Sequence, residues 1–288
     1  MSIVKDPSLR RIPSDAAPAP HGDVGDLADF VARHPRMFVV TGAGVSTGSG
    51  IPDYRDRFGD WKRQRPVQYH DFMTESSMRA RYWARSLVGW RSFHAAVPNA
   101  AHVALARLEQ AGRLRLLVTQ NVDGLHQAAG SRRVIDLHGR LDRVICMSCR
   151  QTSPRGGWQL LLEDSNAAWV GLGADAAPDG DADLDDLDFS EFTVPPCPRC
   201  GGVVKPDVVF FGENVPPWRH TQAVAALATS DALLVVGSSL MVYSGYRYAA
   251  AAARMAKPVV AVNIGRTRAD HLFGVKVAGD VGDTLSDL

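Results

Sequence analysis

The sequence lacks the features that would assign it to a membrane, a secretory route or a nucleic-acid surface. No apolar run approaches the roughly 20 residues that span a bilayer, and the N-terminus has no apolar secretory core. The formal net charge is only +1, so no global field favours nucleic acid or an anionic membrane. We expect a cytoplasmic protein with no membrane partner and no specific nucleic-acid partner. A mitochondrial matrix location is less favoured, because the N-terminus is too acidic for a transit peptide at Asp6, Asp15, Asp23 and Asp26.

Cysteine is also scarce, and its spacing is informative. The 4 cysteines form two C-x-x-C pairs, Cys146/Cys149 and Cys197/Cys200. Two disulfides would suit a secreted chain, and a redox motif would need only one pair. We predict one structural zinc ion per chain, held by four thiolates. Four thiolates fill a tetrahedral shell, so this metal has no open position for catalysis.

Short apolar runs alternate with helical stretches along the chain. Continuous Val/Leu runs separated by helices are typical of a parallel sheet covered on both faces. We therefore predict an α/β fold with a Rossmann-like parallel sheet, helices on both faces and a small inserted zinc-binding module. The expected strands are Phe38–Val40, Leu116–Val118, Val134–Leu137, Val208–Phe211, Leu233–Val236 and Val259–Val262; the clearest helices are Ala100–Gln110 and Thr221–Thr229.

The domain organisation follows from composition. Residues 1–25 are rich in proline, alanine and charge, which predicts a flexible N-terminal arm, and residues 26–288 are expected to form one domain. The zinc-binding insertion spans about residues 140–205, between the strands near Ile135 and Val209. Within it, the acidic segment 175–191 is expected to be a solvated, mobile loop. A calcium loop is disfavoured there, because Leu184 and Ser190 stand where glycine and glutamate are needed.

A glycine-rich segment, TGAGVSTGSGIPDYR, covers Thr41–Arg55 directly after an apolar run. Such a turn between a strand and a helix lets backbone N–H groups approach phosphate, and the helix N-terminus adds a favourable dipole. The dehydrogenase fingerprint G-x-G-x-x-G is broken, because Thr47 stands at its third glycine. No second strand with an acidic end follows at the expected distance. The segment predicts a bound dinucleotide that is not used for hydride transfer.

Three more expected strands end in polar or glycine-rich residues, namely Thr119-Gln120-Asn121, Gly237-Ser238-Ser239 and Asn263-Ile264-Gly265. Ligands of open α/β sheets bind at the carboxyl ends of the strands. The sequence therefore predicts one shared site there.

Taken together, the motifs resemble those of the sirtuins, the NAD-dependent protein lysine deacylases. The resemblance covers about residues 30–285, and its details are most similar to class II sirtuins, including the mitochondrial member and bacterial relatives. The segments that carry it are TGAGVSTGSGIPDYR, TQNVDGLHQAAG, LHG, the two C-x-x-C pairs, KPDVVFFGE, VVGSSL and VNIG.

The resemblance implies a reaction and a set of residues. The acyl-lysine carbonyl attacks the nicotinamide ribose, nicotinamide leaves, and a histidine takes a proton from a ribose hydroxyl; the products are nicotinamide, O-acyl-ADP-ribose and free lysine. His138 matches that base, whereas His94, His102 and His126 are expected to be structural. Asn121 and Asp123 match the other catalytic positions. The implied NAD-binding residues are Gly42, Ala43, Gly44 and Ser46 near phosphate; Asp53, Tyr54 and Arg55 around nicotinamide; Gln120, Asn121 and Asp123; Gly237, Ser238 and Ser239; and Asn263, Gly265 and Val281 near adenosine.

The resemblance also implies a peptide cleft. An extended acyl-lysine peptide would insert as a strand between Phe211-Gly212-Glu213 and Met241-Val242-Tyr243, which gives affinity through main-chain hydrogen bonds. Val209 and Phe210 would line the lysine tunnel, although plain sheet core is an equal reading for Phe210.

Three other functions stay open at this point: a mono-ADP-ribosyltransferase, a non-enzymatic zinc-ribbon binding module, and a dehydrogenase, which the broken glycine fingerprint disfavours. The acyl preference is also open. A tyrosine and arginine pair of the kind found in sirtuins that prefer acidic acyl groups does not align to residues 58–66, and Arg57, Arg63 and Arg65 are the candidates to meet an acidic chain. Protein targets and oligomeric state are not indicated.

Overall fold

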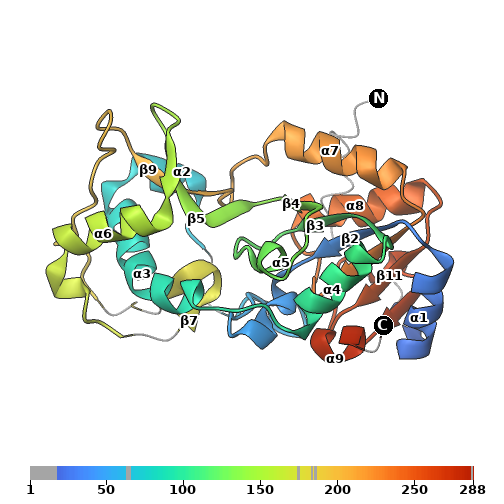
Figure 1. Cartoon of the computed structure of the whole chain (residues 1–288). Helices are drawn as coiled ribbons and strands as arrows, with labels where there is room; N and C mark the ends of the chain where they lie inside the picture. The colour runs from blue at the N-terminus through green and yellow to red at the C-terminus, as the bar shows by residue number, and fades with distance from the viewer. Residues whose placement is uncertain (1–17, 63–65, 174–175, 183, 185–186, 287) are drawn as a thin grey trace.

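The computed structural model describes residues 18–62, 66–173, 176–182, 184, 187–286 and 288. Figure 1 shows a larger lobe built on a parallel sheet and a smaller lobe that contains α3, α6 and β9. The chain passes between the two lobes more than once, so the smaller lobe is an insertion into the larger one.

The larger lobe is built on a seven-stranded parallel sheet with the order β1-β12-β11-β10-β2-β3-β4. The last residues of three adjacent strands are in register, since Thr41 pairs with Val236 on one side and with Thr119 on the other. The carboxyl ends therefore form one edge. The strands are β1 (His21–Gly22), β2 (Met37–Thr41), β3 (Leu114–Thr119), β4 (Val134–Asp136), β10 (Ala232–Val236), β11 (Val259–Val262) and β12 (Val275–Val277).

Helices cover both faces of this sheet, as the sequence predicts. Side chains alternate between the faces of a strand. Phe38 and Val40 of β2 face a core shared with α7 (Pro217–Ala228) and α8 (Tyr243–Arg254). Met37 and Val39 face the opposite core, shared with α1 (Val24–Arg33), α4 (Ala100–Gln110) and α9 (Val281–Ser286). The predicted Rossmann-like α/β fold is confirmed.

Ordered structure begins earlier than the expected boundary at residue 26. Asp23 caps α1, because its carboxylate accepts a hydrogen bond from the Asp26 backbone N–H at 3.0 Å, and the Asp26 carboxylate accepts one from the Asp23 backbone N–H at 3.0 Å. Before it, β1 pairs in parallel with β12. The C-terminal part of the predicted arm is thus an edge strand and a helix cap, while residues 1–17 lie outside the described part.

The smaller lobe combines a three-stranded antiparallel sheet with three helices. Its strands are β5 (Gly139–Cys146), β6 (Thr152–Pro154) and β9 (Val204–Val208), and its helices are α2 (Tyr69–Thr74), α3 (Ser76–His94) and α6 (Arg155–Ser165). Phe72, Trp83, Trp158 and Leu162 are buried in one core. This lobe is larger than the predicted insertion of residues 140–205, because α2 and α3 come from a second insertion between β2 and β3.

The expected strand Val208–Phe211 is wrong in position and in sheet. The strand observed, β9, ends at Val208 and pairs antiparallel with β5 outside the parallel sheet. Side chains satisfy the backbone beyond it: Lys205 Nζ donates to the Val208 carbonyl, and the Phe210 N–H donates to Glu213 Oε2 at 3.0 Å. The segment after Val208 is therefore held as a loop.

Residues 187–191 of the acidic segment form a mostly exposed irregular stretch, as expected, but the expectation of a solvated loop is wrong for residues 176–182 and 184. There the chain forms β7 (Ala176–Ala177), a 3₁₀ turn η5 (Pro178–Gly180) and β8 (Asp181–Ala182), which pack on α3. Both carboxylate oxygens of Asp181 accept hydrogen bonds from Arg85, at 2.8 and 2.9 Å. Ala182 and Leu184 are buried. Residues 174–175, 183 and 185–186 lie outside the described part.

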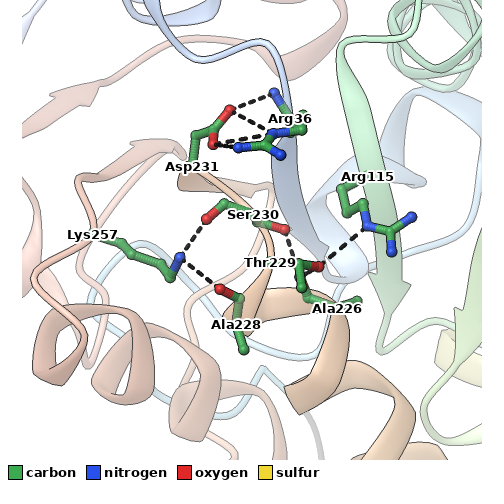
Figure 2. A network of polar contacts seen from close by, with 8 residues as sticks. All are labelled: Arg36, Arg115, Ala226, Ala228, Thr229, Ser230, Asp231 and Lys257. Carbon is green, nitrogen blue, oxygen red and sulfur yellow. Dashed lines mark hydrogen bonds and ion pairs between the residues drawn. The ribbon is translucent and has the colours of Figure 1, made fainter.

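The amino ends of the strands are tied together by polar contacts (Figure 2). Arg36, just before β2, forms an ion pair with Asp231, just before β10, at 2.7 Å. Lys257 Nζ donates to the carbonyls of Ala228, at 3.1 Å, and Ser230. Arg115 Nε donates to the Thr229 hydroxyl at 3.3 Å. These contacts lie at the amino edge of the sheet, opposite the carboxyl edge at which the sequence predicts a ligand site.

The remaining short elements are the helix α5 (Leu125–Ala128) and the 3₁₀ turns η2 (Ala43–Val45), η3 (Thr47–Ser49), η4 (Ala167–Trp169) and η6 (Asp270–Leu272). Across the described residues, every helix is too short or too polar to cross a membrane.

Candidate active site and metal centre

A cleft of about 1790 Å³ lies at the carboxyl edge of the parallel sheet, where residues of both lobes line it. It is large enough for a dinucleotide together with an extended peptide side chain. Every residue assigned above to catalysis, NAD or the peptide lines this cleft except Gly265 and Val281. Its lining includes Gly42, Ala43, Gly44, Ser46, Asp53, Tyr54, Arg55, Gln120, Asn121, Asp123, His138, Val209, Phe210, Phe211, Gly212, Glu213, Gly237, Ser238, Ser239, Met241, Val242, Tyr243 and Asn263.

The glycines at the ends of β2 and β10 interlock. The Gly44 N–H donates to the Gly237 carbonyl at 2.9 Å, and a Cβ on Gly42 would lie 2.7 Å from the Ser238 hydroxyl. Gly237 has a φ of 56°, and a Cβ there would lie 2.5 Å from the Val45 nitrogen. The glycines are needed at Gly42 and Gly44 for close approach, since neither is among the residues with positive φ.

The helix expected after this turn is replaced by two 3₁₀ turns, η2 and η3. Their short hydrogen-bonded rings turn the chain twice within seven residues, Ala43 to Ser49, and keep the loop against the strand ends. The turn is therefore a compact backbone cradle whose glycines leave room for phosphate, without the dipole of a long helix.

Ser46, Asn121 and Asp123 form a hydrogen-bonded trio on one side of the cleft. The Asn121 amide donates to the Ser46 hydroxyl at 2.9 Å, and that hydroxyl donates to Asp123 Oδ2 at 2.7 Å. Asp123 Oδ1 accepts from the Leu125 N–H at 2.9 Å. Each side chain is held in one orientation, so the trio can present fixed donors and acceptors to an amide ligand.

The segment from Asp53 to Lys62 folds over the cleft around an aromatic residue that the sequence motifs did not include. Arg55 stacks on the Trp61 ring, with its guanidinium carbon 3.9 Å from the ring centroid, and donates to the Gly59 carbonyl at 2.7 Å. Tyr54 meets the same ring edge to face at 6.0 Å. Asp53 pairs with Lys62. The segment expected to enclose nicotinamide is thus held together by the aromatic rings of Tyr54 and Trp61.

His138 lies at the end of β4 with both ring nitrogens engaged. Nδ1 lies 2.9 Å from the Gln120 carbonyl oxygen, which can only accept, so Nδ1 carries the proton. Nε2 is then the unprotonated nitrogen, and it accepts a hydrogen bond from the Ser244 hydroxyl at 2.8 Å. Burial lowers the pKa of His138 to about 4; the Gln120 carbonyl opposes this shift, and the positive charge of Arg219 adds to it. The ring is therefore neutral at cellular pH, with Nε2 unprotonated and paired with the Ser244 hydroxyl.

The three histidines expected to be structural, His94, His102 and His126, do not line the cleft. His126 Nε2 lies 2.9 Å from the Thr41 hydroxyl, and its ring is 4.8 Å from that of the fully buried His102. His94 stacks on Trp90 at 4.9 Å. These contacts are those of structural side chains.

The adenosine end of the predicted site is less complete. The Asn263 amide donates to the Ile264 carbonyl at 2.9 Å and fixes its own turn. Gly265 packs against the backbone of Arg57, which lines the cleft, while Gly265 itself does not. Val281 is buried at the start of α9. The roles of Gly265 and Val281 stay predictions.

On the peptide side, the position of Phe210 is consistent with both predictions made for it, a wall of the lysine tunnel and a core residue. It lines the cleft and packs against Phe72 and Tyr82, with ring centroids 5.1 and 5.2 Å apart. The backbone of Phe211 forms a bridge with Gln68, and the Tyr69 N–H donates to its carbonyl at 2.8 Å. One edge of this segment is therefore already paired, and its fixed position suits strand addition from the other side.

Of the three arginines predicted to meet an acidic acyl group, only one can be placed in the structure. Arg57 lines the cleft, whereas Arg63 and Arg65 lie outside the described residues. The lining of the cleft also includes Arg85, which is paired with Asp181, and Tyr82.

The four cysteines meet in the smaller lobe, as predicted. Their sulfur atoms all lie within 4.8 Å of one another, with Cys146 and Cys200 3.5 Å apart and Cys149 and Cys197 3.9 Å apart. A tetrahedron with Zn–S bonds of about 2.3 Å has edges of about 3.8 Å, so the donor set fits one zinc ion. The two pairs come from the β5–β6 turn and the segment before β9, which the metal would join.

Comparison with known proteins agrees with this geometry. The model of the Sir2 family matches residues 42–244, which include the glycine turn, His138 and all four cysteines. The chain belongs to the Sir2 family. A relative from Bordetella bronchiseptica, named NAD-dependent protein deacetylase, is 60% identical over 266 residues, covering 92% of this chain and 97% of the relative.

Solved Sir2 structures share the fold. A Sir2 homologue in complex with NAD superposes with a TM-score of 0.72 at 28% identity, covering 94% of each chain. A Sir2 enzyme bound to acetylated peptide has a TM-score of 0.74 at 28% identity, covering 92% of this chain and 97% of that one. The sirtuin resemblance is confirmed at the level of the family, and the class II assignment stays a prediction.

Sequence reasoning missed Trp61 and Ser244. Trp61 follows the PDYR motif by six residues and belongs to no recurring spacing. Ser244 lies within SLMVYSGYR, where its proximity to His138, 106 residues away in the chain, has no local signal.

Proposed function

We propose that this sirtuin is an NAD-dependent protein lysine deacylase that yields nicotinamide, O-acyl-ADP-ribose and a free-lysine protein. The observation that carries the proposal is the neutral His138 ring, which lines the same cleft as the fixed amide of Asn121 and carboxylate of Asp123 and whose unprotonated Nε2 contacts the Ser244 hydroxyl. The names of the close relatives support the same activity.

The residues of this chain divide the work. The interlocked glycines of β2 and β10 receive the phosphates, and Ser46, Asn121 and Asp123 orient the nicotinamide amide and its ribose. NAD, when bound, supplies the glycosidic bond that is broken and the ribose that accepts the acyl group. His138 Nε2 takes the proton from the ribose hydroxyl, a step typically worth about 100- to 10,000-fold. Trp61, Tyr54 and Phe211 cover the reacting centre and exclude water.

The substrate is an acyl-lysine in an extended peptide segment. The paired backbone of Phe211 and the facing segment at Val242 support main-chain recognition with little sequence preference. The four cysteines hold a structural zinc ion that keeps the smaller lobe, and so one wall of the cleft, in place.

The test is an assay of the purified chain on acetyl-lysine peptide with and without NAD. We expect one nicotinamide released per lysine freed, no reaction without NAD, and a loss of about 100- to 10,000-fold in His138→Ala. Arg36→Ala, at the amino ends of the strands, is the control and should retain full activity. Robust turnover without NAD would overturn the proposal. Transfer of label from NAD to protein without any acyl-lysine would instead favour the mono-ADP-ribosyltransferase.

A further inference from the structure

The Ser244 hydroxyl contacts the nitrogen of His138 that must react. Nδ1 of the ring is already committed to the Gln120 carbonyl, so the hydroxyl meets the lone pair of Nε2, at 2.8 Å. Both residues are half-buried and line the cleft. A hydroxyl in this place occupies the direction from which a ribose hydroxyl would approach the base.

The surrounding backbone is built to bring Ser244 there. Ser244 lies in the first turn of α8, and the next residue is Gly245. A Cβ on Gly245 would lie 2.4 Å from Gln120 Oε1, so a larger residue at this position would displace the Gln120 side chain. Gln120 is held in turn, because its side-chain amide donates to the Ser238 hydroxyl at 2.7 Å and to the Thr41 carbonyl at 3.2 Å. Gln120 thus positions both the ring, through its carbonyl, and the helix that carries the hydroxyl.

We propose that Ser244 is a positioning residue for the general base: its hydroxyl holds His138 Nε2 toward the cleft and is displaced by the ribose hydroxyl when the substrates bind. Ser244 donates no proton to the products and forms no covalent bond. Its contribution is to keep the ring from turning away and to keep a hydrogen-bond partner on Nε2 before the ribose arrives. The inference rests on the role of His138 in the proposed function.

The reaction has two steps, nicotinamide release and the later step in which the base acts, and measuring both distinguishes a positioning role of Ser244 from a structural one. Nicotinamide leaves before the base acts, so exchange of labelled nicotinamide into NAD, with acyl-peptide present, reports the first step. Deacylation reports both steps. In Ser244→Ala we expect kcat for deacylation to fall roughly three- to ten-fold, the effect of losing one neutral hydrogen bond, while exchange and the KM for NAD stay within about two-fold.

Two variants serve as controls. Ser244→Thr keeps the hydroxyl and should recover most of the deacylation rate. Thr221→Ala removes a hydroxyl from the first turns of the neighbouring helix α7, where it donates to the Pro217 carbonyl at 3.1 Å, and should leave both rates unchanged. Equal loss of exchange and deacylation in Ser244→Ala would overturn the proposal, as would an unchanged deacylation rate.

A measurement that needs no turnover distinguishes a failure of the proposed deacylase function from a failure of the proposed role of Ser244. Nitrogen-15 NMR of the His138 ring, assigned with His138→Gln, should show an Nδ1-protonated neutral ring whose Nε2 resonance moves in Ser244→Ala. If Nε2 moves and the wild-type protein has no acyl-lysine activity, the proposed function fails while the contact stands. If the wild-type protein is active and neither Nε2 nor the rate responds to Ser244→Ala, the present inference fails alone.

Discussion

Removal of one zinc ligand should unfold the smaller lobe while the parallel sheet survives. Cys200 is the ligand to change, because it is exposed and its replacement by serine leaves core packing intact. Structural zinc contributes about 10–16 kcal/mol in small zinc domains, whereas a whole domain is stable by only about 5–15 kcal/mol. Cys146 and Cys197 lie in the same core as Trp83 and Trp158, so loss of the metal should reach that core.

The assay combines metal analysis, tryptophan fluorescence and circular dichroism. Wild-type protein should contain one zinc ion per chain, and Cys200→Ser should contain little. Trp83 and Trp158 are almost fully buried, so their emission should shift to the red as the smaller lobe opens. Much of the helical and strand signal of the larger lobe should persist. Ser148→Ala, an exposed non-ligand between two ligands, should keep the metal and the wild-type emission.

Activity should fall with the fold of the smaller lobe, since β9 leads directly to Phe210 and Phe211 in the cleft. A metal-free Cys200→Ser protein with native fluorescence and full activity would refute this reasoning. It would mean that the thiolates need no metal to hold β5 and β9 together.

Three further predictions follow from the larger lobe. Gly237→Ala places a methyl group in a left-handed conformation, 2.5 Å from the Val45 nitrogen; unfolding by urea should show a loss of about 2–4 kcal/mol, with weaker NAD binding by calorimetry. Burial lowers the pKa of His102 to about 4, so on acidification the His102 ring takes up its proton at a higher pH in the unfolded chain than in the folded one. The free energy of unfolding should therefore fall between about pH 6.5 and pH 4, by up to about 3 kcal/mol for this group. Urea titrations of His102→Asn should show a weaker pH dependence. The pKa of His138 is lowered in the same direction, so the acid limb of the kcat/KM profile for deacylation should lie below pH 6.5, and a limb at or above 6.5 would contradict the neutral ring.

Local patterns in the sequence predicted most of the parallel sheet. The runs around Phe38, Leu116, Leu233 and Val259 are apolar because most of their side chains are buried on both faces of the sheet, which is the pattern of strands in a covered parallel sheet. The run at Val208–Phe211 has the same composition, but Glu213 and Lys205 bind its backbone groups and end the strand early. Apolar composition identified a buried segment there, and polar side chains decided its conformation.

The candidate site was predictable where function concentrates residues into motifs. Asn121, Asp123 and His138 stand at strand ends, and the parallel topology brings those ends together. Trp61 and Ser244 have no such signal. Their positions depend on how a loop and a helix dock, and docking is set by contacts between residues distant in the chain, such as Gly245 with Gln120. The prediction for residues 176–182 and 184 of the acidic segment was wrong for the same reason, since Arg85, the partner of Asp181, lies on the distant helix α3.

Gln120 connects the phosphate side of the cleft to the base. Its side chain binds Ser238, next to the interlocked glycines, while its backbone carbonyl fixes the proton on His138 Nδ1. The same backbone packs closely, because a Cβ on Gly42 would lie 2.7 Å from the Ser238 hydroxyl. In the proposed function, the orientation of His138 therefore depends on the strand ends that are proposed to receive the dinucleotide.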